Sequence, residues 1–253
     1  MDFDGFLFDL NGVFYEDENI ISGANETIDW LKKNGIPHKF ISNNSTLSRK
    51  LFVEKLKKIG LKINISDVIT SNYAGVLTIK KMGLKNCKLI MTEEAKLDYK
   101  KFQLQNKKID AIVIGDIGEK WSFSLMNELM NDVISGAEII ALHKGKYYQS
   151  QGKLKIDCGA FVAGLEYSTS KKAISIGKPK KSFFDLAACD LGTNKICIVG
   201  DDLHNDIKGG QKMGYKTILV KTGKYRQNIF DKSKIKPDFC IPSIKELIKL
   251  FKF

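Results

Sequence analysis

The sequence lacks the features of a membrane or secreted protein. No run approaches the ~18 apolar residues of a membrane span. The opening stretch MDFDGFLFDL carries early acids and no basic segment of the kind that begins a secretory signal. The five cysteines are odd in number, widely spaced and without a CxxC pair, which favours reduced thiols. We therefore expect a cytoplasmic protein that makes no use of a membrane.

Acidic residues are too few to balance the basic ones, and the formal net charge is +12. A charge of this size can mark a nucleic-acid or anionic-membrane binder. The lysines, however, occur as scattered pairs such as Lys32-Lys33 and Lys57-Lys58, without a basic arm or an RNA-binding aromatic signature. This pattern is typical of solvated helix faces. We expect no nucleic-acid partner, and we expect the excess charge to attract a small phosphorylated substrate.

Linkers rich in proline, glycine and serine are also absent, and short apolar runs alternate with amphipathic stretches. The runs at residues 6–9, 38–44 and 66–71 predict strands. Between them, apolar residues spaced three and four apart predict helices that close at Gly35 and Gly60. This β-α-β-α-β order predicts a parallel, doubly wound α/β sheet, in which ligands collect at the carboxyl ends of the strands.

The alternation of predicted strands and helices continues through the middle of the chain and into its last segment. CKLIM, DAIVIGD and EIIAL predict the strands of a second α/β unit at residues 77–173. The remaining segment, with KICIVGDD and YKTILV, resembles the first in pattern. We therefore predict one core domain, residues 1–76 and 174–253, interrupted by an inserted α/β domain.

Polar residues with a common chemistry follow four of the predicted elements. They are Asp9 with Asn11, Ser42-Asn43-Asn44, Lys178 in GKP, and Asp201-Asp202 with Asp206 in VGDDLHND. Carboxylates from two strand ends can hold Mg²⁺, a lysine can neutralise a phosphate, and a serine hydroxyl near a helix start can hold phosphoryl oxygens. A carboxylate beside a metal can then attack phosphorus and form an aspartyl-phosphate. Taken singly, Ser42 could be a helix cap and Lys178 a surface lysine.

In this order, the four features resemble the haloacid dehalogenase superfamily over essentially the whole chain. FDLNGV, ISNNST, GKP and GDDLHNDI match its four motifs. The insertion between the second and third motifs is similar to that of the type IIA, NagD-like branch. The resemblance implies a Rossmann-like core with a C2-type cap. GKYYQSQGKLKIDCGAFVAGLEY in the insert and VKTGKYR near the end resemble phosphatases of that branch that act on pyrophosphate, phospholysine and phosphohistidine.

The resemblance also implies roles for single residues. It makes Asp9 the nucleophile and a Mg²⁺ ligand, with the backbone carbonyl of Asn11 and the Asp201 carboxylate as further ligands. It makes Lys178 and Ser42 catalytic residues, with Lys178 also binding the phosphoryl group and balancing its charge. Asp202 and Asp206 are the acids that could hold metal-bound waters, and the family spacing favours Asp206. The phosphoryl group would be held by Ser42, Asn43 and Asn44. A homodimer is suggested by resemblance alone.

Residues of the predicted cap carry weaker signals. A loop after EIIAL contains candidates for contact with the leaving group, namely His143, Lys144, Tyr147 and Tyr148. The alternative is a plain loop with a half-buried tyrosine pair. Asp116, in AIVIGDIGEKWS, imitates the fourth motif but precedes Lys178 in the chain, so we interpret it as the end of a cap strand. Cys158 is interpreted as a packing residue.

An amide at position 11 departs from the superfamily pattern. Many of its phosphatases have an aspartate there, which protonates the leaving group and later activates water. Asn11 does not titrate near neutrality. The sequence thus favours a Mg²⁺-dependent phosphohydrolase acting on pyrophosphate or P–N compounds, whose leaving groups need little acid. The alternatives are a sugar- or nucleotide-phosphate phosphatase and a catalytically weak protein that binds phospho-ligands.

Overall fold

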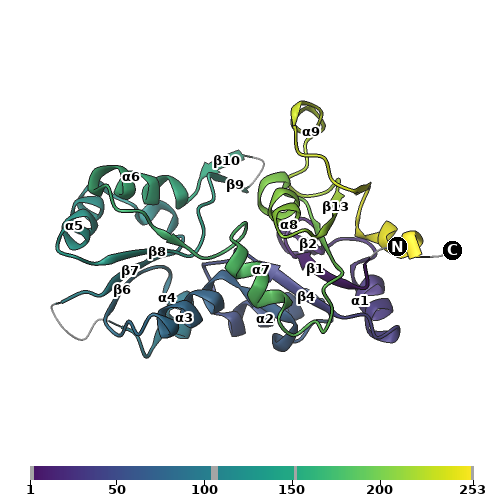
Figure 1. Ribbon diagram of the computed structural model, residues 1–253, viewed down its shortest axis with the longest axis horizontal. Coiled ribbons are helices and arrows are strands. Elements are labelled where there is room, and N and C mark those ends of the chain that lie inside the picture. The colour runs from purple at the N-terminus through teal and green to yellow at the C-terminus, as the bar shows by residue number, and fades with distance from the viewer. Residues whose placement is uncertain (1–2, 104–107, 151–152, 252–253) are drawn as a thin grey trace. The chain divides into compact units, whose positions relative to one another are not determined.

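The chain folds into two compact α/β units, as the computed structural model shows for residues 3–103, 108–150 and 153–251 (Figure 1). The first unit comprises Met1–Ser42, Phe52–Ile69 and Lys178–Phe253, and the second comprises Asn43–Leu51 and Thr70–Gly177. Both units combine helices with a parallel sheet, which confirms the predicted fold class. Two contact boundaries, 69/70 and 177/178, lie near the sequence-based ones at 76/77 and 173/174, but residues 43–51, predicted for the core, belong to the second unit. The roles of core and cap for these units stay a prediction.

The strands fall into two larger sheets and two hairpins. The six-stranded sheet contains β1 (Gly5–Asp9), β4 (His38–Ser42), β5 (Val68–Thr70), β12 (Ile196–Gly200), β13 (Lys216–Val220) and β14 (Phe239–Ile241). The four-stranded sheet contains β6 (Cys87–Ile90), β7 (Ala111–Ile114), β8 (Glu138–Ala141) and β11 (Ile174–Ser175). The hairpins are β2 (Tyr15–Glu16) with β3 (Asn19–Ile20), and β9 (Tyr147–Ser150) with β10 (Lys153–Ile156).

The helices mostly alternate with these strands along the chain. The α-helices are α1 (Ala24–Lys33), α2 (Arg49–Lys58), α3 (Ser71–Lys81), α4 (Glu93–Lys96), α5 (Phe123–Ile134), α6 (Gly159–Thr169), α7 (Lys181–Ala188), α8 (Lys208–Lys212) and α9 (Gln227–Lys232). Short 3₁₀ segments lie at Ile65–Asp67, Leu97–Tyr99, Gly118–Lys120 and Ile244–Phe251, and a π-helical turn at Leu203–Ile207 leads into α8. As predicted from Gly35, α1 ends just before a glycine with φ of +61°.

The six-stranded sheet has the order β14-β13-β12-β1-β4-β5, so the first strand of the chain lies in its interior. All five residues of β1 are buried, as expected for a strand covered on both faces. It pairs in parallel with β12 on one side and with β4 on the other. The carboxyl ends of these three strands therefore meet at one edge, which is where the polar motif residues begin.

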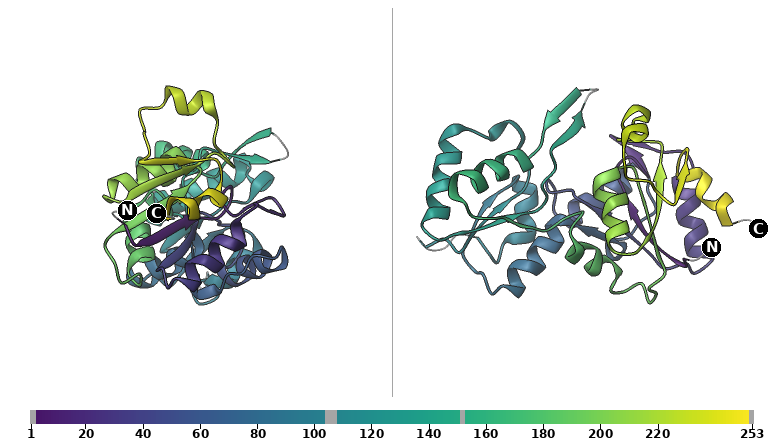
Figure 2. Two further views of the ribbon diagram at one scale, coloured as in Figure 1. Left: turned by 90° about the vertical axis from the view of Figure 1, so that its right-hand side faces the viewer. Right: turned by 45° about the horizontal axis from the view of Figure 1, so that its top comes forward.

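The four-stranded sheet of the second unit has the order β11-β8-β7-β6 and is parallel throughout. Its core is aliphatic and joins the sheet to α5 and α6 through residues such as Ile112, Leu129 and Leu165. The hairpin β9–β10 extends from this unit as an arm, and α9 projects from the first unit between β13 and β14 (Figure 2).

Some elements differ from the sequence-based expectation. The sequence does not predict the helices α3 and α6 or the hairpin β9–β10. The sequence of α6, GAFVAGLEYST, contains few polar residues, so it lacks the apolar–polar alternation that reveals a surface helix. No helix in residues 3–103, 108–150 and 153–251 has the length and apolar character needed to cross a bilayer.

Candidate active site

A buried ammonium group links the carboxylates of two motifs in the first unit. Asp9 ends β1, and Lys178 Nζ lies 2.7 Å from its Oδ1. The same Nζ lies 2.7 Å from Oδ1 of Asp206. The Lys178 side chain is only 3% exposed, so both ion pairs lie in a largely water-free setting. The charges of the two carboxylates outweigh burial and raise the pKa of Lys178, which therefore stays an ammonium.

A third carboxylate completes a cluster that can accept a metal ion. Oxygens of Asp9, Asp201 and Asp206 lie within 4.8 Å of one another. One oxygen of Asp201, Oδ2, accepts the backbone N–H of Lys224 at 2.7 Å. The other, Oδ1, is buried and has no hydrogen-bond partner among the described residues. Buried polar atoms are normally paired. The Oδ1 atom of Asp201 is therefore suited to coordinate a cation.

The charge of the cluster favours a divalent cation. Burial, followed by the charges of Asp9 and Asp206, raises the pKa of Asp201 well above its usual range. Burial and the nearby Asp9 likewise raise the pKa of Asp206, although Lys178 opposes this. The three carboxylates carry more negative charge than the Lys178 ammonium offsets, and a hard 2+ ion with oxygen ligands would reduce this imbalance. The side chains present fit such an ion.

Two glycines hold the position of Asp201. Gly12 and Gly223 have φ values of +84° and +61°, and their backbones pack against each other beside Oδ2 of Asp201. A methyl group on either glycine would overlap this oxygen. The carboxylate is therefore fixed by backbone contact, which a side chain at either glycine would prevent.

We expect Gly223→Ala to weaken metal binding by about 10–100-fold. The added methyl group would displace Oδ2 of Asp201, and the whole carboxylate, including the oxygen that would bind the metal, would move with it. Isothermal titration of the full chain with Mg²⁺ measures this. Gly35→Ala is the matched control, since Gly35 has the same φ of +61° but open space around its Cα. Equal affinity in both variants would show that the contact with Asp201 does not matter.

The two acids after Asp201 have different surroundings. Asp202 accepts the backbone N–H groups of His204 and Asn205 at 2.9 and 3.0 Å, and its Oδ2 lies 3.1 Å from Lys224 Nζ. Burial raises its pKa, but Lys224 and the N–H donors lower the pKa overall to about 2. Asp202 thus stabilises the start of the following helical turn, whereas Asp206 lies with Asp9.

The remaining residues expected at the site differ in burial and in the unit to which they belong. Asn11 is exposed, and its amide makes no hydrogen bond within the described part of the chain. Ser42 is buried at the end of β4, beside the end of β1. Asn43 and Asn44 belong to the second unit. There Asn44 accepts the N–H of Leu47 at 3.1 Å, which stabilises a local turn. Their roles toward phosphate stay predictions.

The cap candidates lie in the second unit. His143 is buried, and its Nε2 lies 3.1 Å from Ser45 Oγ. Lys144 forms an ion pair with Glu166 at 2.6 Å. Tyr147 is half exposed on β9, and Tyr148 is partly buried beside it. Contact of these side chains with a leaving group stays a prediction.

A second group of metal-ligand types surrounds His143. Asp157 and Cys158 place oxygen and sulfur atoms near its ring, within 4.8 Å of one another. Nδ1 of His143 accepts the N–H of Gly145 at 3.3 Å, and Nε2 contacts Ser45, so protein groups already engage both ring nitrogens. Burial raises the pKa of Cys158, which suits the predicted packing role.

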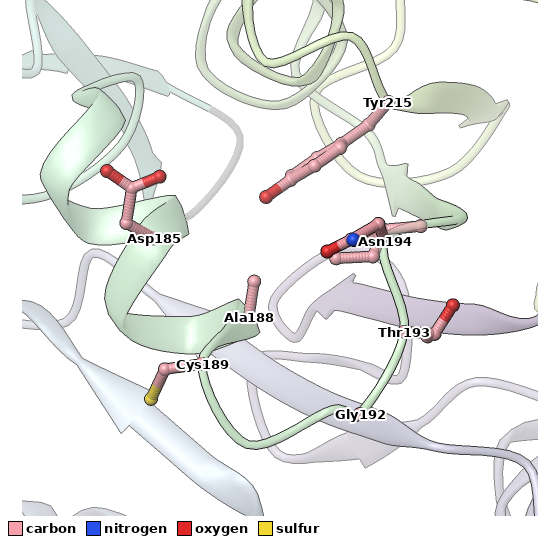
Figure 3. A pocket seen from close by; sticks show the side chains of 8 residues that line it. Asp185, Ala188, Cys189, Gly192, Thr193, Asn194 and Tyr215 are labelled. Carbon is pink, nitrogen blue, oxygen red and sulfur yellow. The ribbon is translucent and has the colours of Figure 1, made fainter.

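A pocket of the first unit lies away from the carboxylates. It opens between the end of α7 and the start of β12, and the hydroxyl of Tyr215 points toward Asp185 across it (Figure 3). Asp201 follows the opposite end of β12. The pocket therefore does not belong to the carboxylate cluster.

Sequence reasoning did not single out Lys224 or the glycine pair. Lys224 is contained in VKTGKYR, a stretch noted for its resemblance but given no chemistry. Tyr15 was also passed over. It is buried, and burial together with the charge of Asp9 raises its pKa, so its hydroxyl stays protonated. No spacing rule connects residues 223–224 with Asp9, because the fold alone brings them together.

Comparisons with known proteins find hydrolases and phosphatases with similar sequences. Residues 6–105 match the family profile of haloacid dehalogenase-like hydrolases, and residues 175–247 match that of the HAD-hydrolase-like group. Mouse haloacid dehalogenase-like hydrolase domain-containing protein 2 is 34% identical over 91% of this chain and 88% of its own length. Zebrafish phospholysine phosphohistidine inorganic pyrophosphate phosphatase is 31% identical over 95% of this chain and 88% of its own.

Solved structures show the same fold over nearly the full length. A 4-nitrophenylphosphatase from Thermotoga maritima is 27% identical, with a TM-score of 0.89 over 98% of this chain and 97% of that one. NagD from Escherichia coli, at 23% identity, shares the fold with a TM-score of 0.85. The chain is therefore an enzyme of the phosphatase type, and it belongs to the haloacid dehalogenase-like hydrolase family.

Proposed function

We propose that the chain is a Mg²⁺-dependent phosphohydrolase that works through an aspartyl-phosphate on Asp9. One observation carries the proposal: Lys178 bridges Asp9 and Asp206, and Asp201, which has a buried oxygen without a partner among the described residues, belongs to the same cluster. Asp9, Asp201 and the backbone carbonyl of Asn11 would hold the ion, with Asp206 beside them. When bound, Mg²⁺ would neutralise charge on the phosphoryl oxygens and orient the substrate.

The chemical steps need only groups of this site. A carboxylate oxygen of Asp9 attacks phosphorus, the bond to the leaving group breaks, and the leaving group departs with the electron pair. Lys178 holds Oδ1 of Asp9 and so fixes the rotation of the carboxylate. A water then attacks the phosphorus of the aspartyl-phosphate, the bond to Asp9 breaks, and the proton of the water leaves with the released phosphate.

The amide of Asn11 restricts the substrates that suit this site. An alkoxide departs slowly without a proton, and Asn11 has none to give. Phosphate leaving from pyrophosphate is a good leaving group, and the nitrogen of a P–N compound can be protonated before cleavage. We therefore assign inorganic pyrophosphate or P–N phospho-compounds as substrates. The zebrafish relative, named for three such substrates, supports this assignment.

A substrate panel with Mg²⁺ tests the assignment. We expect pyrophosphate, phospholysine or phosphohistidine to turn over faster than sugar phosphates. Turnover of ester substrates alone would overturn the leaving-group argument. The similarity to a 4-nitrophenylphosphatase favours ester hydrolysis as the second candidate, so 4-nitrophenyl phosphate belongs in the panel.

We expect Asn11→Asp to raise the turnover of sugar phosphates by about 10²-fold, at the low end of what general acid–base help supplies. Turnover of pyrophosphate should change little, because its leaving group already departs without a proton. The two rates are measured side by side at neutral pH. Asn19→Asp, an exposed residue at the start of β3, is the control for added charge. A rise for both substrates, or for neither, would contradict the argument.

A further inference from the structure

The segment Thr222–Lys224 after β13 is bound closely to the loop that follows Asp9. Thr222 Oγ1 donates to the carbonyl of Gly12, the residue next to Asn11. The N–H of Gly223 donates to Glu16 Oε1 at 2.6 Å, and that of Lys224 donates to Asp201 Oδ2 at 2.7 Å. Three successive residues are thus tied to the two loops that carry the carboxylates, so the position of Lys224 is fixed relative to Asn11.

The side chain of Lys224 differs from that of Lys178 in its exposure. It is 45% exposed, whereas Lys178 is 3% exposed. Its Nζ lies 3.1 Å from Asp202 Oδ2. A lysine side chain is an ammonium near neutral pH, and the ion pair with Asp202 favours that form. The site therefore contains a second permanent ammonium, and a bound molecule can reach it.

The two ammonium groups are placed for different tasks. Lys178 is buried and joins Asp9 to Asp206, so it stabilises the reacting carboxylate itself. Lys224 belongs to the segment packed on Gly12, beside the residue whose counterpart in many relatives donates a proton to the leaving group. Negative charge grows on the leaving group as its bond to phosphorus breaks. A fixed cation at that place would stabilise this charge without transferring a proton.

We propose that Lys224 is a substrate-binding residue that holds the leaving phosphate of pyrophosphate and compensates for the missing acid at Asn11. This inference rests on the proposed function and narrows it. An ammonium favours an anionic leaving group over the amine that departs from a P–N compound. In the reaction, Asp9 forms the new bond to one phosphorus, the bridging P–O bond breaks, and inorganic phosphate departs with the electron pair beside Lys224. No proton is transferred in this step.

Lys224→Met tests the inference, because it removes the charge and keeps most of the side-chain volume. We expect kcat/KM for pyrophosphate to fall by about 10²-fold and that for 4-nitrophenyl phosphate by less than about threefold. The ester is little affected because its leaving group spreads charge over the ring. Lys224→Arg should retain most of the pyrophosphate activity. Lys221→Met is the matched control, since Lys221 carries the same charge and directly precedes the Thr222–Lys224 segment.

A merely structural role of Lys224 gives a different result. If the ion pair with Asp202 only holds the loop, Lys224→Met lowers the rates for both substrates equally and weakens Mg²⁺ binding, which titration detects. That result, or an unchanged rate with pyrophosphate, overturns the inference while the proposed function stands. If the wild-type chain hydrolyses esters and not pyrophosphate, the proposed substrates are wrong. The role of Lys224 is then tested by using pyrophosphate as an inhibitor of ester hydrolysis. If its inhibition constant is the same for Lys224→Met and the wild-type chain, Lys224 does not bind pyrophosphate.

Discussion

Replacing Asp9 by asparagine should lower turnover of every substrate on the order of 10⁴-fold or more, as removal of a covalent nucleophile does. Asparagine has nearly the same shape, but its amide does not attack phosphorus. The protein should stay folded, because Asp206 still pairs with Lys178 when Asp9 is replaced. Steady-state turnover and the mass of acid-quenched protein measure the effect. The wild-type chain should show an added phosphate and the variant should not.

The control for Asp9→Asn makes the same chemical change elsewhere. Asp185 is half exposed on α7 and pairs with Lys181, so Asp185→Asn should keep wild-type turnover. A phosphate adduct that persists in Asp9→Asn would place the nucleophile at another residue. If the wild-type chain turns nothing over and both forms bind phospho-ligands equally well, the chain is a binding protein.

Replacing Lys178 by methionine should cost about 3–5 kcal/mol of unfolding free energy in the absence of divalent cations. The change leaves the buried carboxylates of Asp9 and Asp206 without their shared ammonium. Urea unfolding in a chelator measures the loss. Lys181→Met is the control, because its pair with Asp185 is exposed and should contribute about 0.3–0.5 kcal/mol. Equal losses of unfolding free energy in the two variants would show that burial does not make the Lys178 ion pairs more important for stability than an exposed pair.

The loss in Lys178→Met should depend on pH in a defined direction. Burial raises the pKa of Asp201 and of Asp206 in the folded chain. The folded state therefore holds protons that the unfolded chain releases above about pH 4. Stability from this source is present at low pH and is lost as pH rises through the folded pKa. Lys178 opposes the rise at Asp206, so the pKa of Asp206 should rise further without it, and the variant should lose more stability than the wild-type chain between pH 5 and pH 8.

The carboxylate positions were predictable because they depend on strand ends. Asp9 and Asp201 directly follow apolar runs, and parallel pairing of β1 with β12 brings such ends to one edge. The choice of Asp206 over Asp202 rested on family spacing, and the structure brings Asp206 beside Asp9. The roles of these residues in catalysis stay predictions.

Other parts of the site depend on contacts that no local pattern encodes. The approach of Gly223 to Gly12 joins residues far apart in the chain, and each glycine alone is typical of a turn. The pairing of His143 with Ser45 likewise depends on the fold of the second unit. A sequence shows which groups are present, but side chains on separate loops meet only through tertiary packing.

The central place of β1 in its sheet has a consequence for synthesis of the chain. The strand that carries Asp9 is made first, yet its partner β12 begins at Ile196, and Lys178 also comes late. Until the ribosome has passed these residues, one edge of an apolar strand stays open, and such edges invite pairing with other chains. We therefore expect a chain that stops before Ile196 to keep this edge of β1 open, and to pair with other chains more readily than one that extends beyond Gly200.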